Sequence, residues 1–303
     1  MPISGTFIFT RETWTRRWKI SVLILNNLGA VLVEEGRYSQ ALELYLQITD
    51  FYERNQDSTF LALAYLNTAE INLSLETPDE VRQWIDKAIS VAAAMDNDFA
   101  MARAQLLLGM YFLQLKRDVP ALSIQKALLE TVLEDGDGQL LPEVLLELAR
   151  DHRARGERDS TLYYGQWALR EGEATEQNRL ITWSRNLLGE TLLQDGNPEE
   201  GLENLLVARS IAQNEGYQRA LRDNLRALAE VYHQLGQDGM AYQTQKDYIR
   251  ADSIVFSRES NNRILELQAK YNSRQQQQAI SELEYQRAQD DLRITRGRFF
   301  GVI

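Results

Sequence analysis

Cysteine is absent from the 303-residue chain, and histidine occurs only twice. Without a thiol the protein can form no disulfide, no cysteine nucleophile and no cysteine-based zinc site. The glycine-rich phosphate-binding motifs and the HExxH zinc motif are missing as well. His152 and His233 stand at or beside a large-residue position of a helical pattern, where isolated histidines usually pack or face solvent. The sequence therefore predicts a non-enzymatic protein with no metal site and no cofactor.

Proline is also scarce, with five residues, and runs of β-branched residues are short. Both features favour an all-α fold. The net charge is −11, and the residues after Phe256 carry eight basic and six acidic side chains, so the preceding part has a net charge of −13. An acidic surface repels phosphate groups, which argues against direct nucleic-acid contact by that part. Peptides, basic segments and other proteins remain as candidate partners.

A unit of two helices and a tight turn is clearest in Thr182–Ser210. Gly196 ends the first helix, because glycine accepts the left-handed backbone found just past a helix end. Asn197 is predicted to cap the second helix, with Pro198 at its first position and Glu200 completing a capping box. Such a unit buries its apolar face only by stacking on neighbours of the same kind.

The same unit recurs every 40 residues without insertions. The small position of its first helix is occupied in turn by Gly29, Ala69, Gly109, Ala149, Gly189 and Ala229. Helical patterns on this register predict six helix pairs: Ser21–Glu35 with Tyr38–Arg54, Asp57–Leu75 with Pro78–Met95, Phe99–Leu115 with Val119–Glu134, Leu141–Ala154 with Asp159–Gly172, the two halves of Thr182–Ser210, and Gln218–Leu235 with Gly239–Phe256. Thr77 is a second predicted cap, before the helix that begins with Pro78.

This pattern resembles the tetratricopeptide repeat family, whose first helix carries Leu-Gly or Leu-Ala and whose second helix carries small residues. The resemblance covers residues 20–256 and implies an all-α fold, a right-handed α-solenoid of six antiparallel helix pairs followed by a long C-terminal helix. The family's usual repeat of about 34 residues is shorter, and the proline expected near each repeat end is absent. HEAT-type repeats, which also run near 40 residues, are the alternative. The small-residue pattern favours the tetratricopeptide interpretation.

The two ends of the chain differ from this array. Residues 1–19 are predicted either as an N-terminal lead or fragment start or, with Trp14 and Trp18 four residues apart, as part of a helix that caps the array. Residues 257–297 have the heptad-like spacing of a polar stalk or coiled-coil helix. Residues 298–303 contain FFGVI, which is predicted as the start of a transmembrane segment.

This order of parts is similar to that of sensor proteins of Bacteroidetes-type bacteria. In those proteins a periplasmic tetratricopeptide array continues through a coiled helix and one membrane span into a histidine kinase or a DNA-binding domain. The stretch LELQAKYNSRQQQQAISELE carries the resemblance. It implies the sensory part of a membrane-anchored signal-transduction protein, with a periplasmic array and a homodimer through the stalk helix.

One observation favours a different location. The arginines that precede FFGVI lie on the array side of the predicted span, and by the positive-inside rule they would place the array in the cytoplasm. A soluble cytoplasmic scaffold or a peptide-responsive regulator is therefore the alternative function.

The first helix of each pair lines the concave face of a solenoid, so a peptide or protein ligand is expected there. The candidate groove residues are Asn27, Asn67, Arg103, Arg150, Trp183, Asn186, Glu190 and Glu230. Asparagine amides can donate to and accept from a peptide backbone, although they can equally serve local networks. The family's carboxylate clamp uses five polar places, of which only Asn67 and Arg103 match. Other residues fill the remaining places (Asn26, Ala30 and Leu107), so a generic groove is predicted rather than one specific for a peptide C-terminus.

Overall fold

The computed structural model describes residues 11–55, 57–75, 77–135, 138–253 and 273. The described helices belong to one unit, which ends at Glu259. The predicted stalk, apart from Ser273, and the predicted start of a transmembrane segment lie outside the described residues.

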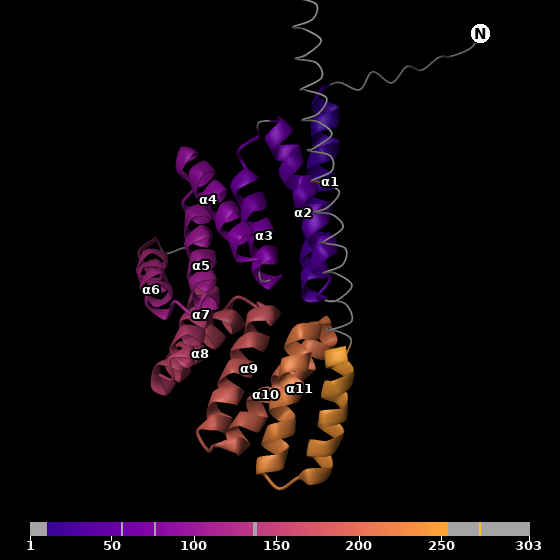
Figure 1. The fold of residues 1–303 in the computed structure, drawn as a ribbon, viewed down its shortest axis with the longest axis vertical. Coiled ribbons are helices and arrows are strands. Elements are labelled where there is room, and N and C mark those ends of the chain that lie inside the picture. The colour runs from indigo at the N-terminus through magenta and orange to yellow at the C-terminus, as the bar shows by residue number, and fades with distance from the viewer. Residues whose placement is uncertain (1–10, 56, 76, 136–137, 254–272, 274–303) are drawn as a thin grey trace, which may run out of the picture. The chain divides into compact units, whose positions relative to one another are not determined.

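The described chain folds into consecutive helix pairs that stack side by side (Figure 1). The pairs are α1 (Arg11–Glu34) with α2 (Tyr38–Asn55), α3 (Leu61–Ser74) with α4 (Pro78–Ala94), α5 (Asp98–Gln114) with α6 (Asp118–Asp135), α7 (Leu141–Ala154) with α8 (Arg158–Ala174), α9 (Asn178–Gln194) with α10 (Pro198–Glu215), and α11 (Gln218–Gln234) with a helical segment at residues 238–253. The prediction of an all-α solenoid of helix pairs is confirmed.

Three helix starts differ from the prediction by four residues or more, and one of them is that of α9, which begins at Asn178 rather than Thr182. Helix α1 begins at Arg11, ten residues before Ser21, so residues 11–19 continue into the first helix. Helix α3 begins at Leu61 rather than Asp57. The Asp57 carboxylate accepts a hydrogen bond from the backbone N–H of Thr59 at 3.2 Å, and this local contact holds residues 58–60 in a turn before the helix starts.

The small positions of the first helices have like surroundings, as the 40-residue register predicts. Gly29, Gly109 and Gly189 each face a large side chain 16 residues later, on the second helix of the pair. A Cβ atom at these glycines would lie only 2.6–2.8 Å from that side chain, which belongs to Tyr45, Gln125 and Leu205 respectively. Each glycine therefore lets the second helix approach closely, which explains why the position never holds a residue larger than alanine.

The turns between helices follow the same register. The residue at the end of the first helix has a positive φ of 56–79° at positions 36, 116, 156, 196 and 236. The turn after the second helix repeats this geometry at Asp96, Glu176 and Gly216, with φ of 48–78°. Lys116, Asp96 and Glu176 thus adopt a left-handed backbone that glycine adopts without strain.

The predicted side-chain caps are wrong in detail. Asn197 and Thr77 do occupy the capping positions, and Pro198 and Pro78 follow them, but neither cap side chain bonds to its helix. The Asn197 amide donates to the carboxylate of Asp195 at 2.8 Å. The Thr77 hydroxyl lies 3.2 Å from the carbonyl oxygen of residue 72. These contacts stabilise the turn instead of the helix start.

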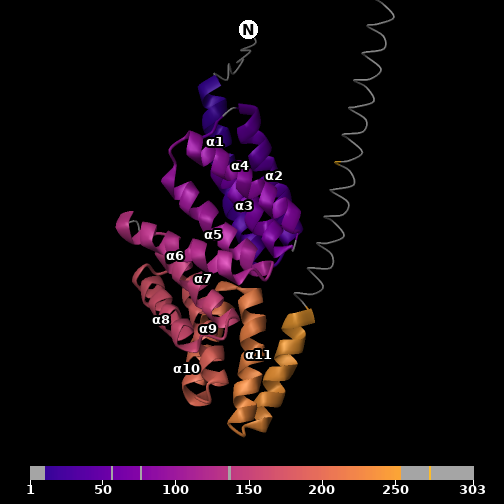
Figure 2. The same ribbon diagram turned by 60° about the vertical axis from the view of Figure 1, so that its left-hand side comes forward.

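The stack curves so that its last helices return toward its first ones. Figure 2 shows α1–α4 in the upper part and α7–α11 in the lower part, with α5 and α6 between them. The Arg219 guanidinium at the start of α11 donates to the Tyr38 hydroxyl at the start of α2, at 3.0 Å and 181 residues away. A channel therefore forms between the first and last pairs.

Candidate functional site

Two cavities occupy the concave side of the array, with volumes of about 500 Å³ and about 550 Å³. Most of the lining residues come from the first helices of the six pairs, which are α1, α3, α5, α7, α9 and α11. The two cavities share Val33, Glu34, Glu70, Arg103 and Arg179, so they are adjoining halves of one channel. Volumes of this size are typical of sites that hold small ligands or peptide segments.

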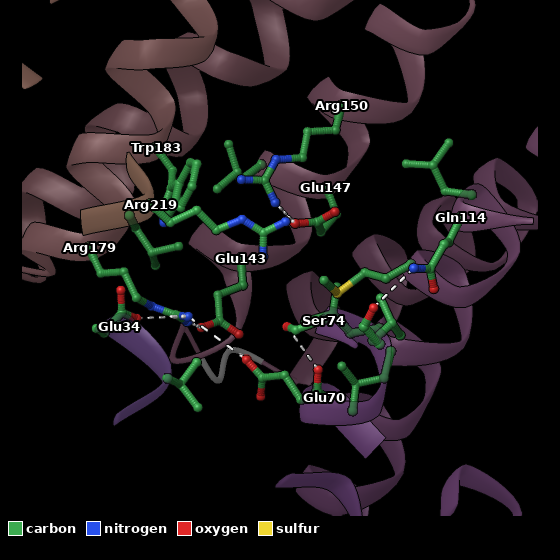
Figure 3. Close-up of a pocket in the computed structure, with 18 of the residues that line it drawn as sticks. Glu34, Glu70, Ser74, Gln114, Glu143, Glu147, Arg150, Arg179, Trp183 and Arg219 are labelled. Atoms are coloured by element: carbon green, nitrogen blue, oxygen red, sulfur yellow. Dashed lines mark hydrogen bonds and ion pairs between the residues drawn. The ribbon is translucent and has the colours of Figure 1, made fainter. Parts of the chain in front are cut away.

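Arg179 lies where the two halves meet. Its guanidinium reaches from α9 to Glu143 of α7 at 2.6 Å, to Glu34 of α1 at 3.8 Å and to Glu70 of α3 at 3.9 Å. Figure 3 shows its side chain pointing toward these three carboxylates. One arginine thus connects four helix pairs across the channel.

Burial and charge act in opposite directions in this cluster. Burial alone lowers the pKa of Arg179, but Glu143, Glu70 and Glu34 together raise that pKa above its ordinary value. Burial raises the pKa of Glu34, and the neighbouring Arg179 charge opposes part of that rise. Glu70 also pairs with Arg103, and the Arg219 charge acts on Glu34 as well, so the three carboxylates of the cluster are largely compensated by neighbouring guanidinium groups.

Two further ion pairs line the first cavity. Arg103 of α5 donates to Glu70 at 3.0 Å, and Arg150 of α7 pairs with Glu147 one turn away. The Arg150 guanidinium also lies over the Trp183 ring, 5.2 Å from its centroid (Figure 3). Stacking on an aromatic face fixes the direction of a guanidinium and leaves its edge free to bond.

Apolar side chains cover the rest of this cavity. They come mainly from α5, α7 and α9 and include Leu106, Leu107, Met110, Leu146 and Leu180. The lining of this cavity therefore combines apolar side chains with paired charges. A channel of this kind can accept an apolar side chain while charged groups fix the orientation of the ligand.

Polar side chains from the first two helix pairs line one end of the second cavity. The Asn67 amide donates to the Asn26 side-chain oxygen at 2.9 Å, and the Tyr45 hydroxyl lies 3.4 Å from the Asn26 carbonyl oxygen. Burial raises the pKa of Tyr45 to about 12, so this hydroxyl stays protonated and can donate. Gly216 and Tyr217 line the opposite side, at the turn before α11.

The structure brings four of the eight predicted groove residues into the channel: Asn67, Arg103, Arg150 and Trp183. The other four line neither cavity. Asn27 and Glu230 are exposed elsewhere, and Glu190 pairs with Arg153 of α7. Asn186 is buried between α9 and α11, where it donates to the Ala220 carbonyl and accepts from Asn224.

The four residues of the Arg179 cluster (Arg179, Glu34, Glu70 and Glu143) were not among the predicted groove residues. Two of them, however, occupy the same positions of the 40-residue unit as residues that were predicted. Arg103 and Trp183 occupy one position of the 40-residue unit, and Glu143 and Asp223 occupy the same position in other pairs and line the same cavity. Glu70 likewise shares the position of Arg150. Arg179 and Glu34 belong to other positions, and their meeting depends on the curvature of the stack.

No family model matches the sequence, and no curated protein matches it either. Similarity is found among solved structures. A Rap protein complexed with Competence and Sporulation Factor is 10% identical with a TM-score of 0.59, and the match covers 78% of this chain and 76% of that chain. A putative kinesin light chain with TPR-like repeats from Podosopora anserina is 13% identical with a TM-score of 0.50, covering 65% of this chain and 95% of that one.

A third similar structure belongs to a signal-transduction ATPase with a tetratricopeptide repeat sensor, from Pyrococcus horikoshii. It is 16% identical with a TM-score of 0.52, and the match covers 82% of this chain but only 43% of the ATPase. These likenesses establish a tetratricopeptide-like solenoid fold. None of the helices in the described part of the chain has the length and apolar character of a membrane span.

Proposed function

We propose that the array is a non-enzymatic module that binds an extended peptide or a protein segment in the channel lined by its first helices. The observation that carries this proposal is the continuity of the two cavities, which share Arg179, Glu34 and Glu70 and draw on all six helix pairs. An extended ligand contacts successive pairs at once, so many weak contacts add to a specific affinity. The fold of the Rap protein complexed with Competence and Sporulation Factor supports this choice.

The channel favours a ligand with both apolar and charged side chains. The apolar part of the lining, which includes Leu106 and Met110, can remove an apolar side chain of the ligand from water. Arg103 and Arg150 are already paired with carboxylates, so a charged ligand group must exchange with an existing pair rather than meet a bare charge. A peptide with both positive and negative side chains can bond to both partners of an ion pair. It therefore gains more binding free energy from this exchange than a peptide whose charges all have the same sign.

Selection from a displayed library of random peptides of about 12 residues tests the proposal. Such a library contains peptides whose aromatic side chains can be buried in the channel, and a buried aromatic anchor gives an affinity that can be measured. Enriched peptides are synthesised, and their dissociation constants are measured by fluorescence anisotropy. Trp183→Ala should weaken binding about tenfold or more, because an aromatic contact contributes about 1.4 kcal/mol or more. Tyr163→Ala on α8 is the control, since Tyr163 is exposed outside the channel. Failure to enrich any peptide, or equal binding by both variants, would contradict the proposal.

We further propose that this module is the sensory part of a membrane-anchored bacterial signalling protein. The order of array, polar helix, arginines and FFGVI in the sequence supports it, as does the likeness to an ATPase with a tetratricopeptide repeat sensor. Fractionation of the native host's cells, with detection of the endogenous protein, tests this role. Retention in membranes after an alkaline carbonate wash supports it, whereas recovery in the soluble fraction supports the alternative of a soluble scaffold or regulator.

A further inference from the structure

Helix α1 carries an exposed apolar face on the side away from α2. Ile24, Leu28 and Val31 are 60%, 46% and 54% exposed, and Leu23 beside them is 61% exposed. These residues lie within three helical turns and form one continuous strip. The sequence from Ile20 to Val33 contains no charged residue, although the array as a whole is strongly acidic.

The 40-residue register shows what this face is. In the second and sixth helix pairs the corresponding three positions are at most 3% exposed, and they hold Ala64, Thr68, Ile71, Asn224, Leu228 and Val231. The fourth and fifth pairs show similar burial. The face is therefore the surface on which a helix pair receives its neighbour, and on α1 that surface has no neighbour in the described structure.

The contact that covers this face elsewhere is close. Gly165 of α8 packs against Leu188 of α9, and a Cβ atom at Gly165 would lie 3.0 Å from a Leu188 methyl carbon. Leu188 occupies the position of Leu28 in the first pair. A helix laid along α1 at similar distance would remove the exposed strip from water, which is the main driving force for such contacts.

We propose that α1 binds α1 of a second copy of the chain in an antiparallel pair. Ile24 and Val31 lie at equal distances along the helix from the point between Asn27 and Leu28. A two-fold axis through that point therefore places Ile24 of one copy opposite Val31 of the other. It also places Leu28 against the Asn27 and Leu28 of the second copy. The absence of charge over Ile20–Val33 removes the repulsion that two acidic arrays would otherwise feel at their contact.

The opposite end of the array does not match the apolar strip of α1. Its last described helix, residues 238–253, leaves Gln245 exposed and Asp252 half-buried at positions that are buried in earlier pairs, next to the exposed side chains of Tyr242 and Ile249. Stacking α1 on this face would bury the polar groups of Gln245 and Asp252 and would generate an open filament, whereas a pair of α1 helices closes on itself.

Analytical ultracentrifugation of the full chain between about 1 and 500 µM tests the proposal. The range extends to high concentrations because two α1 helices, one from each copy, bury a small area for a stable interface, so weak affinity is expected. A monomer–dimer equilibrium in the micromolar range is expected. Ile24→Glu and Leu28→Glu should each weaken dimerisation at least tenfold, while Val119→Lys, at an exposed position on α6, should not. A chain that is monomeric throughout, forms filaments, or dimerises equally well with Ile24→Glu refutes the proposal.

Cross-linking locates the interface without disturbing the apolar strip. The chain has no cysteine, so Asn27→Cys introduces a single thiol at the proposed two-fold axis. Mild oxidation should convert Asn27→Cys to a covalent dimer much faster than Val119→Cys. Circular dichroism checks that each variant retains its helices. Equal rates of cross-linking for the two cysteine variants would overturn the placement of the axis.

Discussion

Asp151 provides the sharpest test of the packing, because it is a carboxylate at a position that the second and sixth pairs fill with buried apolar residues. The same register position holds Ile71 and Val231, both buried. Asp151 on α7 is completely buried, and neither carboxylate oxygen has a hydrogen-bond partner among the described residues. Burial raises the pKa of this carboxyl to about 7, with Glu147 adding to the rise.

The sign and size of the effect follow from that pKa. In the unfolded chain the group loses its proton near pH 4, whereas the folded protein holds the proton until about pH 7. The unfolded state therefore binds fewer protons in this window, and the group lowers stability as the pH rises through it. Three pH units at about 1.4 kcal/mol each give a penalty of about 4 kcal/mol above pH 7.

Asp151→Asn removes the ionisation while keeping the shape of the side chain. We expect the variant to be more stable than the parent by about 4 kcal/mol at pH 8 and about equal to it at pH 4. Urea unfolding followed by circular dichroism at several pH values measures the difference. Asp159→Asn, at an almost fully exposed position, should change stability by less than about 1 kcal/mol with no such trend. A constant difference between Asp151→Asn and the parent from pH 4 to 8 would refute the reasoning.

Three further predictions concern the channel and the helix contacts. Arg179→Met should lower the thermal midpoint more at pH 7.5 than at pH 5, because it removes the charge that opposes the raised pKa of the buried Glu34 carboxyl, and an equal loss at both values would contradict this. Lys116→Gly should stabilise the protein by about 0.5–1 kcal/mol in urea unfolding, because it relieves a left-handed backbone at φ 56°. Gly189→Ala should cost about 1–3 kcal/mol, since its Cβ would lie 2.6 Å from Leu205 and 3.0 Å from a backbone oxygen. Gly109→Ala should cost less in the same assay, because it meets only a flexible glutamine side chain, and the reverse order would contradict this explanation.

Four of the eight predicted groove residues lie in the channel and four lie outside it, although members of both groups share register positions. Arg103 and Trp183 share one register position, which faces the concave side in several pairs. Glu190 and Glu230 share the position of Arg150, yet they leave the channel in the last two pairs. A register position specifies the face of a helix, but the curvature of the stack decides which pairs bring that face to the channel.

Asn186 illustrates a second limit of reading from the sequence. Its position one residue before the peptide-contacting place suggested the channel, but its amide is satisfied inside the array by Ala220 and Asn224. A buried amide needs partners, and the neighbouring pair supplies them here. The choice between a ligand contact and an internal contact depends on a neighbour 34–38 residues away.

The periodic sequence by itself determined the helix pairs, their turns and the small contact positions. Those features depend on short-range properties: helical periodicity, a left-handed turn and room for the second helix 16 residues on. Only the tertiary structure decided that Arg179 would meet Glu34, 145 positions earlier, and that α11 would reach the start of α2. Small rotations between successive pairs add up over the whole array, and their sum is not encoded in any one repeat.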